Sequence, residues 1–385
     1  MNEELWDVIN HLGEERERWL GAVAPPIFQS SMFAYPTVDA LREAVAKEMD
    51  VPFYTRGHNP TVRLLAIKLA ALEGAEEALV FSSGSAAMAA AILAFLRSGD
   101  HLLCVEKPYG WTAVLVREML PRFGISAEFL DMRDPAAVAA AIRPNTRMIV
   151  LESPNSWTFE QQDLKAIAAL ARPRGILTVC DNSYATPLLQ RPLALGIDLV
   201  VHTLTKYLNG HSDALAGAVC GSRKLIERIF RGPYMSFGAV LSPHDAFLII
   251  RGLRTLPLRL ERSASNAEKV AHFLAQHPKV RALWRAATGE RSPGGQLEGG
   301  NGLITIALNG GAAAAERFCN ALRRFLLTCS WGGYESLAWP LAALYPKGYE
   351  GPLPKGLSLD MVRLSIGLEP AERLIADLEQ ALAAA

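Results

Sequence analysis

The chain has 385 residues, a length that favours one large domain with a smaller one beside it. Its 39 Lys and Arg residues balance 39 Asp and Glu residues, and no apolar run approaches the roughly 18 residues of a membrane span, so nucleic acid and membranes are disfavoured as partners and a small molecule is favoured. The five cysteines are scattered without a CxxC pair, and the N-terminal segment lacks a signal-peptide pattern, so we expect free thiols, no metal site and a cytoplasmic protein.

The first 60 residues form an irregular segment. It is rich in proline and aromatic residues, a helix is predicted near residues 37–48, and it ends in the sequence Tyr54-Thr-Arg-Gly-His-Asn-Pro. A segment of this kind rarely builds a core of its own. We therefore treat residues 1–60 as an arm that precedes the domains.

Short apolar runs alternate with helical patterns over residues 61–245, the predicted large domain. The runs cover residues 78–81, 101–106, 127–131, 147–152, 176–181 and 198–203. Strands joined by helical crossovers predict a mostly parallel, doubly wound α/β sheet. A helical pattern over 244–277 then leads to strand-like runs at 280–284, 303–308 and 361–368, which predict a smaller α+β domain over residues 246–385.

The end of the first predicted strand is a candidate anion site. Ligands of open parallel sheets bind at the carboxyl ends of the strands. This strand runs into Ser82-Ser83-Gly84-Ser85 and an Ala-rich helix, whose first turn presents free backbone N–H groups to an anion such as phosphate. An ordinary strand-to-helix turn explains the pattern equally well.

Two later strand ends hold a carboxylate and a lysine. Asp181 follows a buried run, where a carboxylate is costly without a cationic partner such as a protonated pyridine nitrogen; a helix N-cap or a structural ion pair is the alternative. Thr203 and Thr205 are predicted to point to one side and to bond phosphate oxygens. Lys206 beside them has the arrangement needed for a Schiff-base lysine, although a lone lysine is usually a solvated charge. Tyr109 follows another strand, where its ring can stack on a flat cofactor or pack in the core.

Seven strings of the sequence, in this order and spacing, carry a resemblance: YTRGHNPT, FSSGSAA, YGWT, DNSYATP, HTLTKYLNGHSD, SWGGYESL and RLSIGLE. Together they resemble the Cys/Met-metabolism family of pyridoxal-phosphate enzymes, of fold type I, over nearly the whole chain. By that resemblance Lys206 holds pyridoxal 5'-phosphate as a Schiff base, Asp181 pairs with the pyridine nitrogen, and Tyr109 stacks on the ring. Lys206 and Tyr109 are also its implied catalytic residues. The residues implied to hold the phosphate are Gly84, Ser85, Thr203 and Thr205.

The resemblance also implies a substrate site. Arg363 lies in an apolar run, a poor place for a guanidinium without a carboxylate, and the family uses it to grip the α-carboxylate of an amino-acid substrate. An arginine–carboxylate pair internal to the protein is the alternative. Ser330 and Trp331 are implied to border the same pocket. Ser156 falls where many relatives have an asparagine near the phenolic oxygen of the cofactor, and Asn155 is the alternative for that part.

The arm takes a role from the same resemblance. In the family a Tyr-x-Arg sequence of the N-terminal segment reaches the cofactor phosphate of a neighbouring subunit, and Tyr54 and Arg56 stand at its positions. Tyr54 is also expected to border the substrate. The resemblance therefore implies a homo-oligomer with shared active sites, at least a dimer and commonly a tetramer.

The reaction depends on whether the β- or the γ-substituent leaves. The segments ESPNSWTFE and SWGGYESL look more like bacterial cystathionine β-lyases, since γ-synthases and γ-lyases typically carry Glu-Ser-Leu where this chain has Cys329-Ser330-Trp331. The favoured function is a carbon–sulfur β-lyase that cleaves L-cystathionine, or a related S-substituted cysteine, to a thiol (homocysteine), pyruvate and ammonia. The alternative is γ-replacement or γ-elimination, as in a cystathionine γ-synthase, an O-acylhomoserine sulfhydrylase or a γ-lyase, which the arm sequence favours. A non-catalytic homologue and a nicotinamide-dependent dehydrogenase are disfavoured, because the lysine, aspartate and arginine are all present and no G-x-G-x-x-G follows the first strand.

Overall fold

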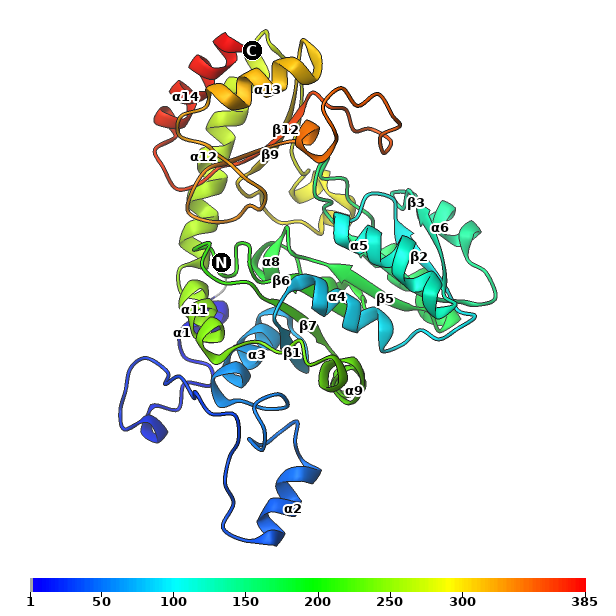
Figure 1. The fold of residues 1–385 in the computed structure, drawn as a ribbon, viewed down its shortest axis with the longest axis vertical. Coiled ribbons are helices and arrows are strands. Elements are labelled where there is room, and N and C mark those ends of the chain that lie inside the picture. Colours follow the sequence, from blue (N-terminus) through cyan, green and yellow to red (C-terminus); the bar gives the residue numbers. More distant parts are fainter. Residues whose placement is uncertain (1–2) are drawn as a thin grey trace.

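The computed structural model describes residues 3–385 and contains two β-sheets (Figure 1). The larger sheet has seven strands in the order β1-β7-β6-β5-β4-β2-β3. Neighbours among β2 to β6 pair in parallel, whereas β7 runs antiparallel to both β1 and β6. This confirms the predicted α/β fold with a mostly parallel sheet. The strands are β1 (Glu77–Phe81), β2 (His101–Val105), β3 (Ser126–Leu130), β4 (Thr146–Glu152), β5 (Leu177–Asp181), β6 (Leu199–Thr203) and β7 (Gly217–Gly221).

Strand β7 is the one strand of this sheet that the apolar runs do not predict. Its sequence, GAVCG, has three residues with side chains between two glycines. Both glycines allow close packing: a Cβ on Gly217 would lie 2.3 Å from the carbonyl oxygen of Ser83, and a Cβ on Gly221 would lie 2.7 Å from the side chain of Leu199. The composition of β7 thus reflects tight contact with its neighbours and not β-propensity.

Helices cover both faces of the larger sheet, as expected of a doubly wound fold. Side chains alternate along each strand, so that Cys180 joins the apolar core beneath α3 and Val179 joins the core beneath α4. The helices of the first core are α1 (Glu3–Asn10), α3 (Pro60–Glu73), α6 (Pro135–Ala141), α7 (Leu164–Ala171) and α11 (Pro243–Leu253). Around the second core lie α4 (Gly84–Leu93) and α9 (Arg223–Ile229), and α5 (Gly110–Val114) leads into it at Leu115 and Val116. The short helices are α8 (Thr186–Leu189) and α10 (Met235–Phe237).

Helix α3 begins directly after the arm and shows how the local sequence sets an element. The side chain of Asn59 accepts hydrogen bonds from the N–H groups of Thr61 and Val62, and Pro60 occupies the first helical position. Gly74 ends the helix in the left-handed conformation, with φ of +71°. These signals fix where the arm ends and the large domain begins.

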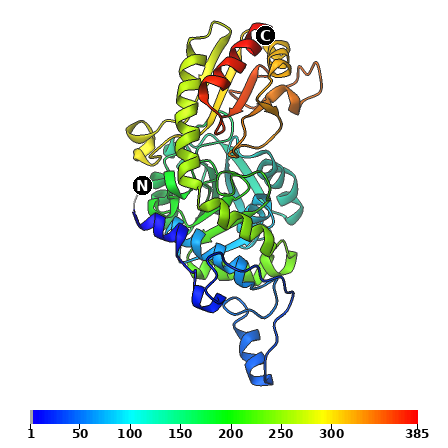
Figure 2. The same ribbon diagram turned by 90° about the vertical axis from the view of Figure 1, so that its left-hand side faces the viewer.

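The smaller sheet has five strands in the order β10-β11-β12-β9-β8, and α12 (Leu256–Gln276) leads into it from the larger domain (Figures 1 and 2). Helices α12, α13 (Gly311–Ala321) and α14 (Ala371–Ala384) share an apolar core with one face of this sheet. Although α12 has 21 residues, none of the helices within residues 3–385 is both long and apolar enough to cross a membrane. The strands are β8 (Val280–Trp284), β9 (Leu303–Leu308), β10 (Leu326–Leu327), β11 (Leu337–Pro340) and β12 (Met361–Ser365).

Apart from α1, which packs against α3, the arm projects away from both sheets in two perpendicular views (Figures 1 and 2). Its helix α2 (Val38–Ala46) confirms the helix predicted near residues 37–48. The arm exposes many large apolar side chains, which are Val23, Phe28, Met32, Val38, Leu41, Val45 and Tyr54. The division of the chain at residues 60 and 245 stays a proposal, and its second boundary falls within α11, which packs against α3.

Candidate active site

The carboxyl ends of three adjacent strands bring polar side chains together in the middle of the larger sheet. β4 ends at Glu152 and β5 ends at Asp181, and these two residues are paired in the sheet register. β6 ends at Thr203, three residues before Lys206. Side chains at the ends of parallel strands meet at one edge, where ligands of such sheets bind.

Lys206 lies in the turn after β6, and its amine is held by a residue of the smaller domain. The Nζ atom donates a hydrogen bond to Oγ of Ser330 at 2.8 Å and lies 5.5 Å from the centre of the Trp331 ring. Ser330 has φ of +82°, an uncommon conformation for a residue with a side chain and one that often marks a functional site. Burial, followed by the positive charge of Arg363, lowers the pKa of Lys206 to about 8. The amine is therefore neutral in part near physiological pH.

Asp181 is buried without a cationic partner. The backbone N–H and the hydroxyl of Ser183 both donate to its Oδ1 atom, at 2.9 and 2.5 Å. Among residues 3–385 no ion pair reaches Asp181 and no hydrogen bond reaches Oδ2. Burial raises the pKa of this carboxyl, while the Ser183 hydrogen bonds and the nearby His202 and Lys206 oppose the increase. A cationic group placed against Oδ2 would relieve the cost of burial.

The N-terminus of α4 approaches the end of β6 closely. The side chain of Ser83 caps α4 by accepting from the N–H of Ala86, and Ser85 is exposed in the first turn. A Cβ on Gly84 would lie 2.1 Å from the hydroxyl oxygen of Thr203, so a glycine is needed there. The free N–H groups of this turn and the positive end of the helix dipole favour an anion.

Thr205, one of the two predicted phosphate hydroxyls, lies in the turn after β6, and its contact with the phosphate stays a prediction. β6 ends at Thr203, so Thr205 does not belong to the same strand and the alternation of side chains does not apply to it. The Thr205 hydroxyl donates to the carbonyl oxygen of Ala216 at 3.3 Å and accepts from its N–H at 3.1 Å. Thr205 thereby ties the turn after β6 to the start of β7.

Arg363, in β12, is buried and faces the large domain. Its guanidinium donates to the carbonyl oxygens of Ser156 at 3.0 Å and Ser330 at 3.5 Å, and it lies over the Trp157 ring at 5.3 Å. Within the described chain no ion pair joins Arg363 to a carboxylate, so the internal pair considered as an alternative is absent. Burial lowers the pKa of Arg363 to about 10, which still leaves it a cation at neutral pH. An unpaired buried guanidinium suits a substrate carboxylate.

Tyr109 and Ser156 both contact a residue that the sequence did not single out. Glu152 accepts a hydrogen bond from the N–H of Tyr109 at 2.6 Å and from the hydroxyl of Ser156 at 2.7 Å. The argument that pointed to Asp181, a carboxylate at the end of an apolar run, applies equally to Glu152. Asn155 does not share this environment, because its Oδ1 accepts from three backbone N–H groups of the following loop.

Tyr109 is the N-cap residue that precedes α5, and it is 43% exposed. Burial of its hydroxyl, followed by the negative charge that ionised Cys329 and Asp181 would contribute, raises the pKa of Tyr109, so the phenol keeps its proton at neutral pH. Cys329 is exposed and directly precedes Ser330, whose hydroxyl accepts from Lys206, so it lies near the same group of residues.

Tyr54 and Arg56 do not join this group within their own chain. The guanidinium of Arg56 lies 5.6 Å from the centre of the Tyr54 ring, and no hydrogen bond or ion pair in residues 3–385 links either side chain to Lys206 or Asp181. Their position on the projecting arm leaves contact with another subunit as a proposal.

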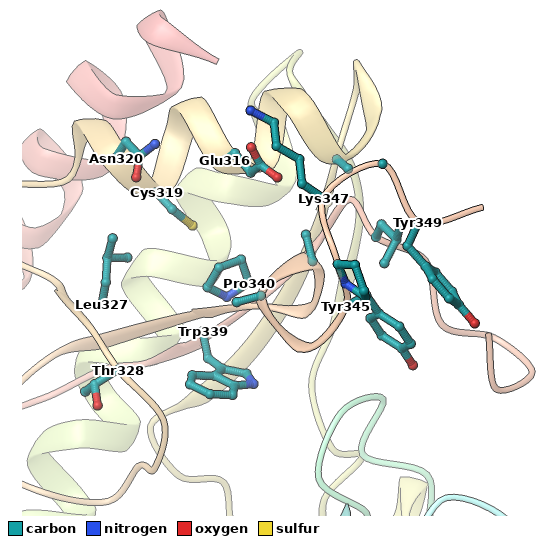
Figure 3. Close-up of a pocket in the computed structure, with 16 residues that line it drawn as sticks. Glu316, Cys319, Asn320, Leu327, Thr328, Trp339, Pro340, Tyr345, Lys347 and Tyr349 are labelled. Atoms are coloured by element: carbon teal, nitrogen blue, oxygen red, sulfur yellow. The ribbon is translucent and has the colours of Figure 1, made fainter. Parts of the chain in front are cut away.

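A cavity of about 500 Å³ lies in the smaller domain, apart from the strand ends (Figure 3). Trp339, Tyr345 and Tyr349 line it, together with Glu316 and Lys347. None of the predicted site residues belongs to its lining. Chemistry therefore points to the strand ends of the larger sheet and not to this cavity.

Comparisons with known proteins agree on one family. The model of the Cys/Met metabolism PLP-dependent enzymes matches residues 8–383. An L-methionine gamma-lyase of Pseudomonas putida is 41% identical over 97% of this chain and 96% of its own length, and a cystathionine gamma-synthase of Mycobacterium bovis is 38% identical over 97% and 95%. The crystal structure of metB from Corynebacterium glutamicum has a TM-score of 0.90 at 34% identity, over 98% of this chain and 97% of that one.

These relatives overturn the predicted β-lyase function. They bear the names of a γ-lyase and a γ-synthase and cover nearly the full length of the chain. The prediction relied on the segments ESPNSWTFE and SWGGYESL and on the residues at 329–331, of which Cys329 lies exposed in an irregular segment between β10 and β11. The γ-alternative is the interpretation that the comparisons support.

The residues at the strand ends fit pyridoxal phosphate. Asp181 is a buried carboxylate without a cation, Lys206 has an amine of lowered pKa, and the N-terminus of α4 offers N–H groups beside Thr203. Arg363 supplies a cation for the substrate. With the match over residues 8–383 and the full-length relatives, the chain belongs to the Cys/Met metabolism family of pyridoxal-phosphate-dependent enzymes.

Proposed function

We propose that the protein is a γ-lyase that acts on L-methionine or a similar L-amino acid with a sulfur substituent at the γ-carbon. With water, L-methionine would give methanethiol, 2-oxobutyrate and ammonia. The observation that carries the proposal is the 41% identity to an L-methionine gamma-lyase over 97% of the chain. The site geometry supports this proposal, because the site contains a base, an acid and a cation that can bind the substrate carboxylate.

Lys206 would hold the cofactor through its amine, and Asp181 would pair through its free Oδ2 with the pyridine nitrogen. Gly84, Ser85, Thr203 and Thr205 would surround the phosphate near the N-terminus of α4, and Tyr54 and Arg56 would reach it from a second subunit. The cofactor, when bound, supplies an electron sink for the charge left at the substrate carbons.

Arg363 would orient the substrate. Its guanidinium is preorganised by the carbonyl oxygens of Ser156 and Ser330 and by the Trp157 ring, and it has no carboxylate partner among the described residues. A bidentate pair with the α-carboxylate would place the α-carbon near Lys206. Ser330 and Trp331 would border the same pocket, since both contact the Lys206 amine.

Lys206 and Tyr109 would move the protons. The released Lys206 amine, with its pKa near 8, is suited to take the proton from the α-carbon. It would pass that proton to the bound cofactor, which leaves the amine neutral again and able to take a proton from the β-carbon, the step that γ-elimination requires. Tyr109 keeps its phenolic proton at neutral pH because burial raises its pKa. It is therefore suited to donate that proton to the departing thiolate.

A γ-replacement reaction is the second candidate, supported by the cystathionine gamma-synthase relative and by the metB structure. The two reactions share every residue named above and differ in whether a thiol adds at the γ-carbon. The test incubates the cofactor-loaded protein with L-methionine alone, and separately with an O-acylhomoserine and cysteine. Release of methanethiol and 2-oxobutyrate from L-methionine supports the γ-lyase; cystathionine formation without turnover of L-methionine overturns it in favour of replacement.

A further inference from the structure

Glu152 links two residues of the proposed site without a part in the proton transfers proposed above. It is the last residue of β4, and its side chain is 6% exposed. One carboxyl oxygen accepts from the N–H of Tyr109 and the other is hydrogen-bonded to the hydroxyl of Ser156. Tyr109 would stack on the cofactor, and the carbonyl of Ser156 holds Arg363. Glu152 thus sits between the cofactor side and the substrate side of the site.

The charges around Glu152 leave it without a counter-ion. Asp181 faces it from β5 and Arg363 from β12, and Tyr109 and the buried thiol of Cys104 interact with it as well. No salt bridge in the described chain includes Glu152. In the proposed site the pyridine nitrogen is the partner of Asp181, and the carbonyl oxygens of Ser156 and Ser330 hold the Arg363 guanidinium without a salt bridge to Glu152, so no cation pairs with this second buried carboxylate.

A buried carboxylate in this position is expected to take up a proton. An isolated buried charge costs several kcal/mol after relaxation of the protein, and a second anion beside Asp181 adds repulsion. Burial, followed by the charge of Asp181, raises the pKa of Glu152 to about 8. A protonated Glu152 keeps both contacts: one oxygen accepts from the Tyr109 N–H, and the O–H group of the acid donates to the Ser156 hydroxyl oxygen.

We propose that Glu152 is a positioning residue that acts as a neutral carboxylic acid, joining Tyr109 to Ser156 through two hydrogen bonds and leaving Asp181 as the only anion facing the pyridine nitrogen. This inference rests on the proposed cofactor site. It does not depend on whether the bound substrate then undergoes elimination or replacement.

The test compares Glu152→Gln with Glu152→Ala. Glutamine has the shape of the neutral acid: its carbonyl oxygen can accept from the Tyr109 N–H, and its amide can donate to the Ser156 oxygen. The readout is the dissociation constant of pyridoxal phosphate, titrated into apoprotein and followed by the absorption of the bound cofactor, without substrate. We expect Glu152→Gln to bind within about threefold of wild type and Glu152→Ala to bind at least about tenfold more weakly, as the loss of two buried hydrogen bonds implies.

The dependence on pH separates a neutral acid from a charged one. Lys206 titrates in the same range in both proteins, so the ratio of the dissociation constants of wild type and Glu152→Gln isolates Glu152. We expect a ratio near one below about pH 7, where the acid is protonated, and a ratio that departs from one above about pH 9, where wild type carries a second anion beside Asp181. Glu152→Gln cannot ionise and would not show this change.

Three results would overturn the inference. They are weak cofactor binding by Glu152→Gln at pH 6, wild-type binding by Glu152→Ala, or the same pH profile for Glu152→Gln and wild type. If Glu152→Ala does not fold, Ser156→Ala replaces it, with intermediate affinity expected from the loss of one bond and unchanged affinity counting against the inference. Since no substrate is present, failure here leaves the γ-lyase proposal standing, and failure of the γ-lyase proposal leaves this result intact.

Discussion

Lys206 and Arg363 are two buried cations that reach the same site from different domains. The charge of Arg363 contributes to the lowered pKa of Lys206. Ser330 joins them, because its hydroxyl accepts from Lys206 and its carbonyl accepts from Arg363. The relative placement of the two domains therefore affects the pKa of Lys206 as well as the position of the Arg363 guanidinium that would bind the substrate carboxylate.

The lowered pKa of Lys206 predicts how cofactor attachment depends on pH. Only the neutral amine can attack the cofactor aldehyde, so the attachment rate of apoprotein should rise with pH up to about 8 and then level off. An ordinary lysine, with a pKa of about 10.4, would keep gaining reactivity beyond pH 9. Stopped-flow absorbance between pH 6 and 10 measures the rate, with N-acetyl-lysine as the reference amine. A profile that parallels the reference would contradict the geometry described for Lys206.

Replacement of Arg363 should affect substrate binding above all. Without the guanidinium the α-carboxylate meets only carbonyl oxygens and a Trp ring, so Arg363→Ala should raise KM by roughly a hundredfold or more, the effect typical of a truncated buried ion pair. Arg281→Ala is the matched control, because Arg281 lies in the same sheet and pairs with Asp360 at its exposed edge. Steady-state kinetics on both variants makes the comparison. An unchanged KM in Arg363→Ala would show that Arg363 does not bind the α-carboxylate of the substrate.

At the scale of elements, most strands of the larger sheet can be predicted from the sequence, because each buried strand consists of a short run of apolar residues. The six predicted runs coincide with β1 to β6, and Asp181 was recognised because it follows such a run. β7 was not predicted, because close packing against Ser83 and Leu199 requires glycines in place of apolar side chains. Glu152 was not predicted as a site residue for another reason. Its partners, Tyr109 and Ser156, come from two different loops, and the pattern of a single sequence does not show that these loops meet.

The contact between α4 and β6 predicts the effect of a single methyl group. In Gly84→Ala the new Cβ would clash with Thr203, and moving α4 away would withdraw its N–H groups from the phosphate. We expect a loss of cofactor affinity of about tenfold or more with a fall in stability of roughly 1–3 kcal/mol. Gly300→Ala is the control, since its Cβ meets only an ordinary contact of 3.5 Å with Arg285. Equal affinities of the two variants would refute the close approach of α4.

At the scale of the whole molecule, the structure of a single chain does not explain the role of the arm. Beyond α1 it projects from the domains and exposes apolar side chains (Figures 1 and 2). Within residues 3–385 no hydrogen bond or ion pair links Tyr54 or Arg56 to Lys206 or Asp181. A second copy of the chain would cover this surface and receive both residues. We expect at least a dimer with active sites shared between subunits.

Mixing two inactive variants tests the shared site. In a mixed dimer of Lys206→Ala and Arg56→Ala one site receives both defects and the other receives none. Co-refolding equal amounts should therefore restore about a quarter of wild-type activity by random pairing, while each variant alone has little. As the control, each single variant is refolded alone at twice its concentration in the mixture, so that the total protein concentration is the same. Absence of any recovery, with mixed dimers verified by mass spectrometry, would show that each site is built from one chain.

The identity of the keto acid released from L-cystathionine tests the central claim most directly. Cleavage on the γ-side gives cysteine, ammonia and 2-oxobutyrate, whereas cleavage on the β-side gives homocysteine, ammonia and pyruvate. The account of Lys206 as the base for both the α- and β-carbon protons predicts 2-oxobutyrate, absent in Lys206→Ala. Pyruvate in place of 2-oxobutyrate would contradict γ-chemistry at this site.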